Sequence, residues 1–341
     1  MLNAATPALA VAVSRAGGIG FIAGGSNLES LNESLKSVSS LLRSSSGAAG
    51  SPKDAGTLPI GVGFQLWGCD LNVAVAALAK HKPAVAWLFA PKRTEDLAGW
   101  SEGLRRATNG ETRIWVQVGS VAEARLAVQH AQPDVLVVQG SDAGGHGLAQ
   151  SASVVSLVPE VLDMLEAVRQ SEIPVLAAGG ITEGRGVAAA LALGASGVVM
   201  GTRFLAAQEA GVAKGWKEAI VRTHDGGQST SRSTLCDRLK ETKGWPACYD
   251  GRAVTNKAHA DEGRGMPDAA NVALYKTELA EGSKSAWGPE GRMVTYAGTG
   301  VGLIRRIQPA AEIVSEVRSS AGLALRRAAE TSDGKRSESK L

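Results

Sequence analysis

The sequence predicts an α/β fold in which strands and helices alternate regularly, and three observations support this prediction. Short runs of apolar and β-branched residues alternate with amphipathic, Ala- and Leu-rich segments from the N-terminus to about residue 200. The runs are continuously apolar, which is typical of parallel strands that helices cover on both faces. The chain contains 42 glycines, which is typical of many tight turns between strands and helices. Repeats of this kind form right-handed strand–helix–strand crossovers.

Seven runs are predicted to be strands of one parallel sheet. They are Gly18–Ala23, Ile60–Phe64, Val85–Phe89, Ile114–Val118, Val135–Gln139, Pro174–Ala178 and Gly197–Met200. The helix patterns between them include Leu28–Leu42, Leu71–Lys80, Val121–His130, Val154–Arg169 and Arg185–Leu193. A TIM (β/α)8 barrel needs eight strands, and this chain enters a helix pattern at Pro7–Ala16 without an earlier strand. We therefore expect a TIM barrel that lacks its first strand, and an open sheet is the alternative.

The regular alternation of predicted strands and helices, and the point where it stops, divide the chain into four parts. Residues 1–210 are expected to form the barrel core. Residues 211–303 are polar, rich in turns and contain Trp216, Trp245 and Trp287, which predicts an irregular and helical excursion over the active-site face of the barrel. We expect a helical segment at residues 304–329 and a flexible tail at residues 330–341, because the tail is too polar to pack.

Composition and charge exclude several classes of protein. Lys and Arg total 36 against 33 Asp and Glu, a balance that does not favour nucleic acid or an anionic membrane as partner. No apolar run approaches the roughly 20 residues that a membrane span needs. Cys69, Cys236 and Cys248 are too few and too far apart for a disulfide framework or a CxxC metal site. The sequence therefore predicts a soluble intracellular protein without a bound metal.

The most informative motif is Gly140-Ser-Asp-Ala-Gly-Gly-His-Gly147, which follows the predicted strand Val135–Gln139. Active sites of barrels lie at the carboxyl ends of their strands. The four glycines leave the backbone bare enough for a planar ligand, and His146 projects among them. A Gly-rich turn with an incidental surface histidine is the alternative. Asp142 is a candidate to orient His146, or to cap the segment that follows.

Two further Gly-rich loops, Ala177-Ala-Gly-Gly-Ile-Thr182 and Met200-Gly-Thr-Arg-Phe204, follow the last two predicted strands. Each opens a helix, and backbone N–H groups at such positions bind phosphate. Together the loops predict a phosphate site, with two ordinary tight turns as the alternative. Gly18–Ala23 matches a GxGxxA pattern but is itself a strand, so it is not a dinucleotide-binding loop. Gly298–Gly302 lacks a surrounding strand–helix–strand unit, and we expect it to be a close backbone approach to the site.

These motifs resemble those of the nitronate monooxygenase family, formerly called 2-nitropropane dioxygenases, and in particular its fungal branch. The resemblance runs from Met1 to about Val314. It is carried by Ala16–Phe21, Gly140–Gly147, Ala178–Gly180, Met200–Phe204 and Tyr296–Gly302. It implies a TIM barrel with one non-covalent FMN that oxidises alkyl nitronates, with nitroalkanes as a further substrate class. O2 is the co-substrate, and the products are a carbonyl compound and nitrite.

The resemblance also implies roles for single residues. His146 aligns with the catalytic histidine of the family, as a base for neutral nitroalkanes or as an anchor for the nitro group. The implied cofactor-binding residues are Met1, Gln65, Gln117, Gly145, Ala178, Gly179, Gly180, Gly201 and Thr202. This chain departs from the family pattern at two points. Only Met1 remains of the Ala-Pro-Met that ends the family's first strand, and Asp142 stands where the family usually has Glu.

Two other functions are compatible with the same residues. Relatives that share the Ala-Gly-Gly-His motif include NAD(P)H-dependent quinone or enoyl-thioester reductases that also have an FMN-binding barrel. The second alternative is a truncated barrel that binds flavin but has no enzymatic activity. Reduction of the flavin by NADH separates the first alternative from a nitronate oxygenase, and a failure to retain FMN favours the second.

The last three residues, Ser339-Lys340-Leu341, match the address that the peroxisomal import receptor reads at a C-terminus. The residues before them are polar, so the tripeptide is expected to be accessible. Flavin that reacts with O2 releases peroxide, which this compartment removes. The sequence predicts a peroxisomal protein of a eukaryote; a chance ending on a cytoplasmic protein is the alternative.

Overall fold

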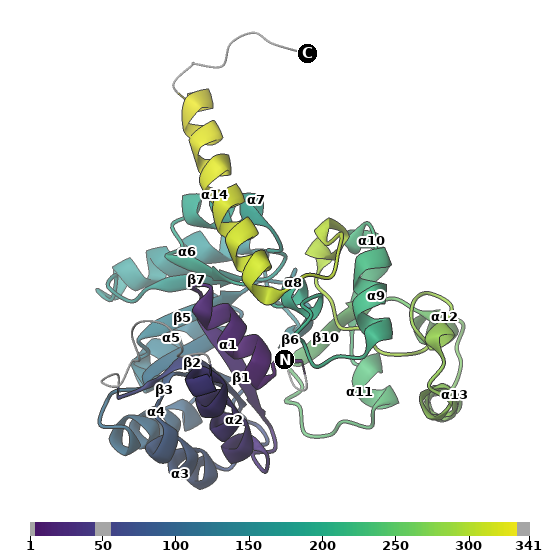
Figure 1. Ribbon diagram of the computed structural model, residues 1–341, viewed down its shortest axis with the longest axis horizontal. Coiled ribbons are helices and arrows are strands. Elements are labelled where there is room, and N and C mark those ends of the chain that lie inside the picture. Colours follow the sequence, from purple (N-terminus) through teal and green to yellow (C-terminus); the bar gives the residue numbers. More distant parts are fainter. Residues whose placement is uncertain (1–3, 45–55, 333–341) are drawn as a thin grey trace.

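The computed structural model (Figure 1) describes residues 4–44 and 56–332. Its main sheet has seven parallel strands in the order β1-β2-β3-β4-β5-β7-β8. Their bounds are Gly20–Gly25, Leu58–Gln65, Pro83–Phe89, Arg113–Val118, Val135–Gln139, Val175–Ala178 and Gly197–Val199. Each strand pairs with the next one along the sheet, as in the wall of a TIM barrel. The predicted fold is therefore confirmed, and among the described residues β1 and β8 do not pair with each other.

A helix follows or precedes each strand and covers the outside of the sheet. These helices are α1 (Pro7–Arg15), α2 (Leu31–Ser44), α3 (Leu71–His81), α4 (Asp96–Ala107), α5 (Val121–Ala131), α6 (Val154–Ala167) and α7 (Gly184–Ala192). Several starts have side-chain caps, and Thr6 accepts a hydrogen bond from the N–H of Leu9 with Pro7 in the first turn. Asp70, Ser120 and Ser153 cap α3, α5 and α6 in the same way.

Alternation along the strands separates two apolar faces. The outer face packs against the helices, whereas Phe21, Trp87 and Trp115 fill the inside of the barrel, with ring centroids 5.2 to 6.5 Å apart. Side chains two residues apart on a strand share a face. Gln65, which pairs with Phe89, and Gln117, two residues after Trp115, therefore belong to the inner face at the carboxyl ends of their strands.

The C-terminal helix α14 (Ala310–Ser332) completes the ring of helices. It packs against α7 and α1 (Figure 1, yellow), and Arg318 donates a hydrogen bond to the carbonyl of Gly17. Residues 4–6 connect β1 with the chain near residue 211. The carbonyl of Ala5 accepts a hydrogen bond from the N–H of Ala23, and the carbonyl of Ala4 accepts one from the N–H of Gly211. The helix expected at residues 304–329 thus begins at Ala310 and is an integral part of the barrel. Residues 333–341 of the predicted tail lie outside the described residues.

Ile313→Ala is expected to lower the free energy of unfolding by about 2–5 kcal/mol, because it leaves a cavity in a packed core. Ile313 is fully buried in the cluster that joins α14 to Leu9 and Val13 of α1. Leu325→Ala, on an exposed part of the same helix, is the control and should change stability little. Urea unfolding of both variants measures the effect. Equal stability of the two variants would show that α14 is not part of the barrel core.

Between β8 and α14 the chain forms the excursion. The short helix α8 (Thr202–Leu205) directly follows β8 in the barrel core. The elements of the excursion itself are α9 (Lys214–Arg222), α10 (Gly226–Ser229), β9 (Thr230–Ser233), α11 (Leu235–Leu239), β10 (Tyr249–Val254), α12 (Lys257–Gly263), α13 (Asp268–Glu281), η1 (Lys284–Ala286) and η2 (Thr299–Leu303). A second sheet, β6-β10-β9, attaches the excursion to the barrel, because β6 (Gly145–Leu148) follows directly from the loop after β5. Over the described residues, no helix is long and apolar enough to cross a membrane.

Candidate active site

His146 lies on β6, which turns away from the barrel and pairs antiparallel with β10 of the excursion. Its imidazole Nε2 lies 2.9 and 3.0 Å from the two carboxylate oxygens of Asp237. The indole of Trp245 stacks on the imidazole with ring centroids 3.8 Å apart and an interplanar angle of 4°. The ring of Tyr296 lies 5.6 Å from the imidazole. Three side chains from the excursion therefore surround this histidine.

Of the two roles considered for Asp142, the orientation of His146 is wrong, because Asp142 forms no hydrogen bond with His146 in the described part of the chain. Its carboxylate accepts hydrogen bonds from the hydroxyls of Thr299 (3.0 Å) and Ser153 (3.1 Å). The pairing of β6 with β10 brings His146 beside α11, where Asp237 is the acid within reach. Asp142 instead joins the loop after β5 to the start of α6 and to η2.

No local pattern in the sequence points to Asp237, which lies 91 residues from His146 on the short helix α11. Signals existed for the two aromatic residues. Trp245 is part of the tryptophan-containing segment that predicted an excursion over the active-site face. Tyr296 begins the Gly-rich segment at residues 296–302. Neither pattern specifies which barrel residue these rings contact.

Trp245 also belongs to a cluster of aromatic side chains at the carboxyl ends of β2 and β3. Its ring centroid lies 5.2 Å from that of Trp67 and 5.9 Å from that of Phe89. Tyr249 packs against Phe89 at 5.4 Å. This cluster places half-buried aromatic surface at part of the barrel mouth, next to His146.

The phenol of Tyr249 lies beside a buried acid. Its hydroxyl donates a hydrogen bond to Glu123 (3.1 Å), whose other carboxylate oxygen accepts one from the N–H of Gly119 (2.7 Å). Burial raises the pKa of Glu123 above its ordinary value and raises the pKa of Tyr249 further from the physiological range. Burial also raises the pKa of Tyr296. The phenols of Tyr249 and Tyr296 are therefore neutral hydrogen-bonding groups rather than bases.

The two loops predicted to bind phosphate lie side by side, because β7 and β8 are neighbours. Ala178 ends β7, and Gly179 and Gly180 follow with φ of +111° and +73°. Gly201 and Thr202 begin α8. Among the residues that the structure describes, the backbone N–H groups of residues 179, 180, 201 and 202 have no hydrogen-bond acceptor. Since α8 is a single short turn, these N–H groups rather than a helix dipole make the place suitable for an anion.

Gly298–Gly302 lies directly against these loops, as the sequence predicted. The N–H of Gly298 donates a hydrogen bond to the hydroxyl of Thr202 (3.0 Å), and the N–H of Thr299 donates one to the carbonyl of Asp142 (3.0 Å). A Cβ atom at Gly300 would lie 2.3 Å from the carbonyl oxygen of Gly180. Only glycine permits this approach, so the segment fixes the positions of the loops after β5, β7 and β8.

Three other predicted cofactor residues, Gln65, Gln117 and Gly145, lie around the barrel mouth. Gln65 ends β2 and Gln117 lies near the end of β4, and neither side chain forms a hydrogen bond with another residue in the described part of the chain. A Cβ atom at Gly145 would meet no other atom within 4 Å, so open space adjoins the backbone next to His146. Met1 lies outside the described residues.

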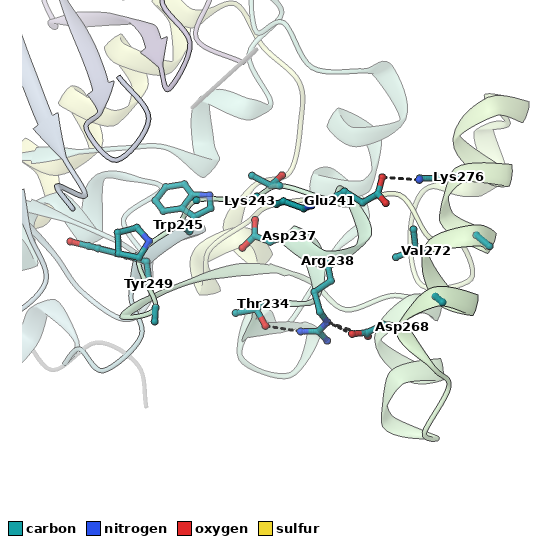
Figure 2. A pocket seen from close by; sticks show the side chains of 16 residues that line it. Thr234, Asp237, Arg238, Glu241, Lys243, Trp245, Tyr249, Asp268, Val272 and Lys276 are labelled. Carbon is teal, nitrogen blue, oxygen red and sulfur yellow. Dashed lines mark hydrogen bonds and ion pairs between the residues drawn. The ribbon is translucent and has the colours of Figure 1, made fainter. Parts of the chain in front are cut away.

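A cavity of about 850 Å³ lies in the excursion, between α11, the loop at residues 241–247 and α13 (Figure 2). Its lining includes Asp237, Trp245 and Tyr249 together with side chains of α13 such as Val272 and Lys276. Asp237 and Trp245 contact His146 as well. They therefore form a wall shared by this cavity and the histidine, whereas the cavity itself does not include the loops after β7 and β8.

Comparison with known proteins shows consistent similarity. A family model described as nitronate monooxygenase matches residues 100–319. The chain is 47% identical over 320 residues to nitronate monooxygenase npaC of Metarhizium robertsii, covering 92% of this chain and 87% of the relative. It is 39% identical over 330 residues to a nitronate monooxygenase of Neurospora crassa, covering 92% and 85%. It is also similar to the solved structure of FabK from Thermotoga maritima, with a TM-score of 0.69, 27% identity and coverage of 98% and 94%.

Proposed function

Because the chain belongs to the nitronate monooxygenase family, we propose that it binds FMN and oxidises alkyl nitronates with O2 to a carbonyl compound and nitrite. The observation that carries this proposal is the placement, around one end of the barrel, of His146 and of two loops whose N–H groups have no acceptor among the described residues. Neutral nitroalkanes are a second substrate class, for which the enzyme must also remove a proton.

The residues present fit FMN in three respects. The N–H donors after β7 and β8 suit the terminal phosphate, since they have no acceptor in the described part of the chain. The side-chain amides of Gln65 and Gln117 at the barrel mouth can bond the polar edge of a flavin ring. Open space beside Gly145 admits a flat group next to His146. A single terminal phosphate site favours FMN over FAD.

Bound FMN supplies the electron transfer from nitronate and the reaction with O2, and the protein supplies position and proton transfer. His146 accepts the proton from the carbon next to the nitro group of a neutral nitroalkane, a role that suits imidazole near neutral pH. The neutral phenol of Tyr296 and the indole of Trp245 confine the reacting group beside the imidazole. The cluster around Trp67 and Phe89 packs against the indole of Trp245.

Anaerobic stopped-flow reduction tests this function. Purified protein saturated with FMN is mixed with pre-formed propyl-2-nitronate or with NADH, and the absorbance of oxidised flavin is followed. We expect nitronate to bleach the flavin and NADH to leave it oxidised. Bleaching by NADH alone would indicate a reductase, and a protein that stays colourless after incubation with FMN would indicate a non-enzymatic role.

We further propose that Ser339-Lys340-Leu341, which lies outside the described residues, directs the protein to peroxisomes through the import receptor. An N-terminal fluorescent fusion should co-localise with a peroxisomal marker, and removal of Leu341 should make it diffuse in the cytosol. Ser337→Ala, just outside the tripeptide, is the control and should leave the location unchanged. A diffuse signal from the intact C-terminus would contradict the proposal.

A further inference from the structure

We propose that Asp237 is a positioning residue that keeps the imidazole proton of His146 on Nε2 and leaves Nδ1 as the nitrogen that accepts the substrate proton. The inference rests on the proposed function, because it assigns a task within the proton transfer by His146. It identifies an acid of the excursion, rather than one of the barrel, as the partner of the histidine.

The hydrogen-bond chemistry of the pair determines the tautomer. Both carboxylate oxygens of Asp237 lie within 3.0 Å of Nε2, and an ionised carboxylate only accepts hydrogen bonds. A neutral imidazole has one N–H group, so this contact places it on Nε2. Among the described residues, Nδ1 of His146 has no hydrogen-bond partner. Nδ1 is therefore the nitrogen with a free lone pair.

The surroundings hold both partners in place. The side chains of His146 and Asp237 are only 11% and 13% exposed, so water competes weakly for their hydrogen bond. Asp237 lies on α11, whose residues Leu235, Cys236 and Leu239 are buried in the core of the excursion. With Trp245 stacked on one face of the imidazole, neither group can turn without displacing packed side chains.

The neighbouring cation does not compete for Asp237. Arg238 forms ion pairs with Glu262 and with Asp268 of α13. Figure 2 shows Arg238 reaching toward Asp268, while Asp237 projects separately from α11. His146 is therefore the polar side chain that engages the carboxylate of Asp237.

The direct test is ¹⁵N NMR of the FMN-bound protein labelled at histidine, with the His146 signals assigned by their loss in His146→Gln. At a pH where the ring is neutral, we expect a protonated Nε2 and an unprotonated Nδ1 in the wild-type protein. Asp237→Asn should weaken this preference, because an amide can either donate or accept. A proton on Nδ1 in the wild-type protein would overturn the inference, whatever the enzyme's activity.

Kinetics test the functional consequence. Asp237→Asn should lower kcat for a neutral nitroalkane by about 10- to 100-fold, with a smaller effect on pre-formed nitronate, since supporting partners of a functional imidazole contribute effects of this size. Asp237→Glu, which keeps the carboxylate, should recover part of the loss. Asp250→Asn removes another largely buried carboxylate, the ion-pair partner of Arg232 on β9, and gives the size of a structural effect.

A double-mutant cycle distinguishes action through His146 from a separate role. If Asp237 acts through the imidazole, Asp237→Asn should cause no further loss in a His146→Ala background. A full additional loss in that background, or an equal loss from Asp250→Asn, would overturn the positioning role. If the wild-type protein oxidised no nitronate, the proposed function would fail, while the NMR result would still decide the tautomer.

Discussion

Gly180→Glu is expected to abolish FMN binding. Gly180, in the loop after β7, has φ of +73°, and its N–H group has no acceptor among the residues that the structure describes. A Cβ atom there would lie 3.0 Å from that of Asp142, and a longer side chain would extend into the space where phosphate approaches the backbone. The added carboxylate would also repel the phosphate. The flavin content of the purified protein and titration with FMN measure the loss, and Gly180→Arg should act similarly through its bulk.

Gly110→Glu is the matched control for this variant. Gly110 has φ of +74°, almost the same as Gly180, and a Cβ atom there would meet nothing within 4 Å. It lies between α4 and β4, near the amino-terminal ends of the strands. Both variants share the backbone strain of a side chain in the left-handed region, so the difference between them reports the site. Unchanged flavin content in Gly180→Glu, or an equal loss in Gly110→Glu, would contradict the phosphate assignment, provided that circular dichroism shows both proteins folded.

His146→Ala is expected to reduce kcat/KM for a neutral nitroalkane by about 10²–10⁴-fold, the usual contribution of a general base. Pre-formed nitronate needs no proton removal, so its oxidation should suffer much less. Steady-state kinetics with nitrite detection measure both substrates. His130→Ala is the control, because His130 lies in the last turn of α5, before β5 begins, and its loss should not change either reaction.

The ratio of the two effects decides the role of the imidazole. A selective loss with the neutral substrate identifies His146 as the base. An equal loss with both substrates would instead identify it as an anchor for the nitro group, and would contradict the assignment of Nδ1 as the acceptor of the substrate proton.

The strands and the Gly-rich loops follow from sequence because their signals are local. A continuously apolar run such as Val135–Gln139 must be covered on both faces, and this demand alone predicts a parallel strand. Gly179 and Gly180 adopt left-handed backbone conformations that favour glycine, so the sequence itself marks the loop. The role of α14 is harder to predict from sequence, because its amphipathic pattern does not reveal that it packs between α7 and α1.

The sequence alone determined that this chain forms a parallel barrel with a histidine and two Gly-rich loops after its strands, since periodicity and glycine conformation act within a few residues. Only the tertiary structure decided what surrounds the histidine. Asp142, three residues after β5, bonds to Thr299, whereas Asp237 reaches His146 across 91 residues of chain. This choice depends on the pairing of β6 with β10 and on the burial of α11. Such contacts arise from packing between distant segments, and no local pattern in the sequence encodes them.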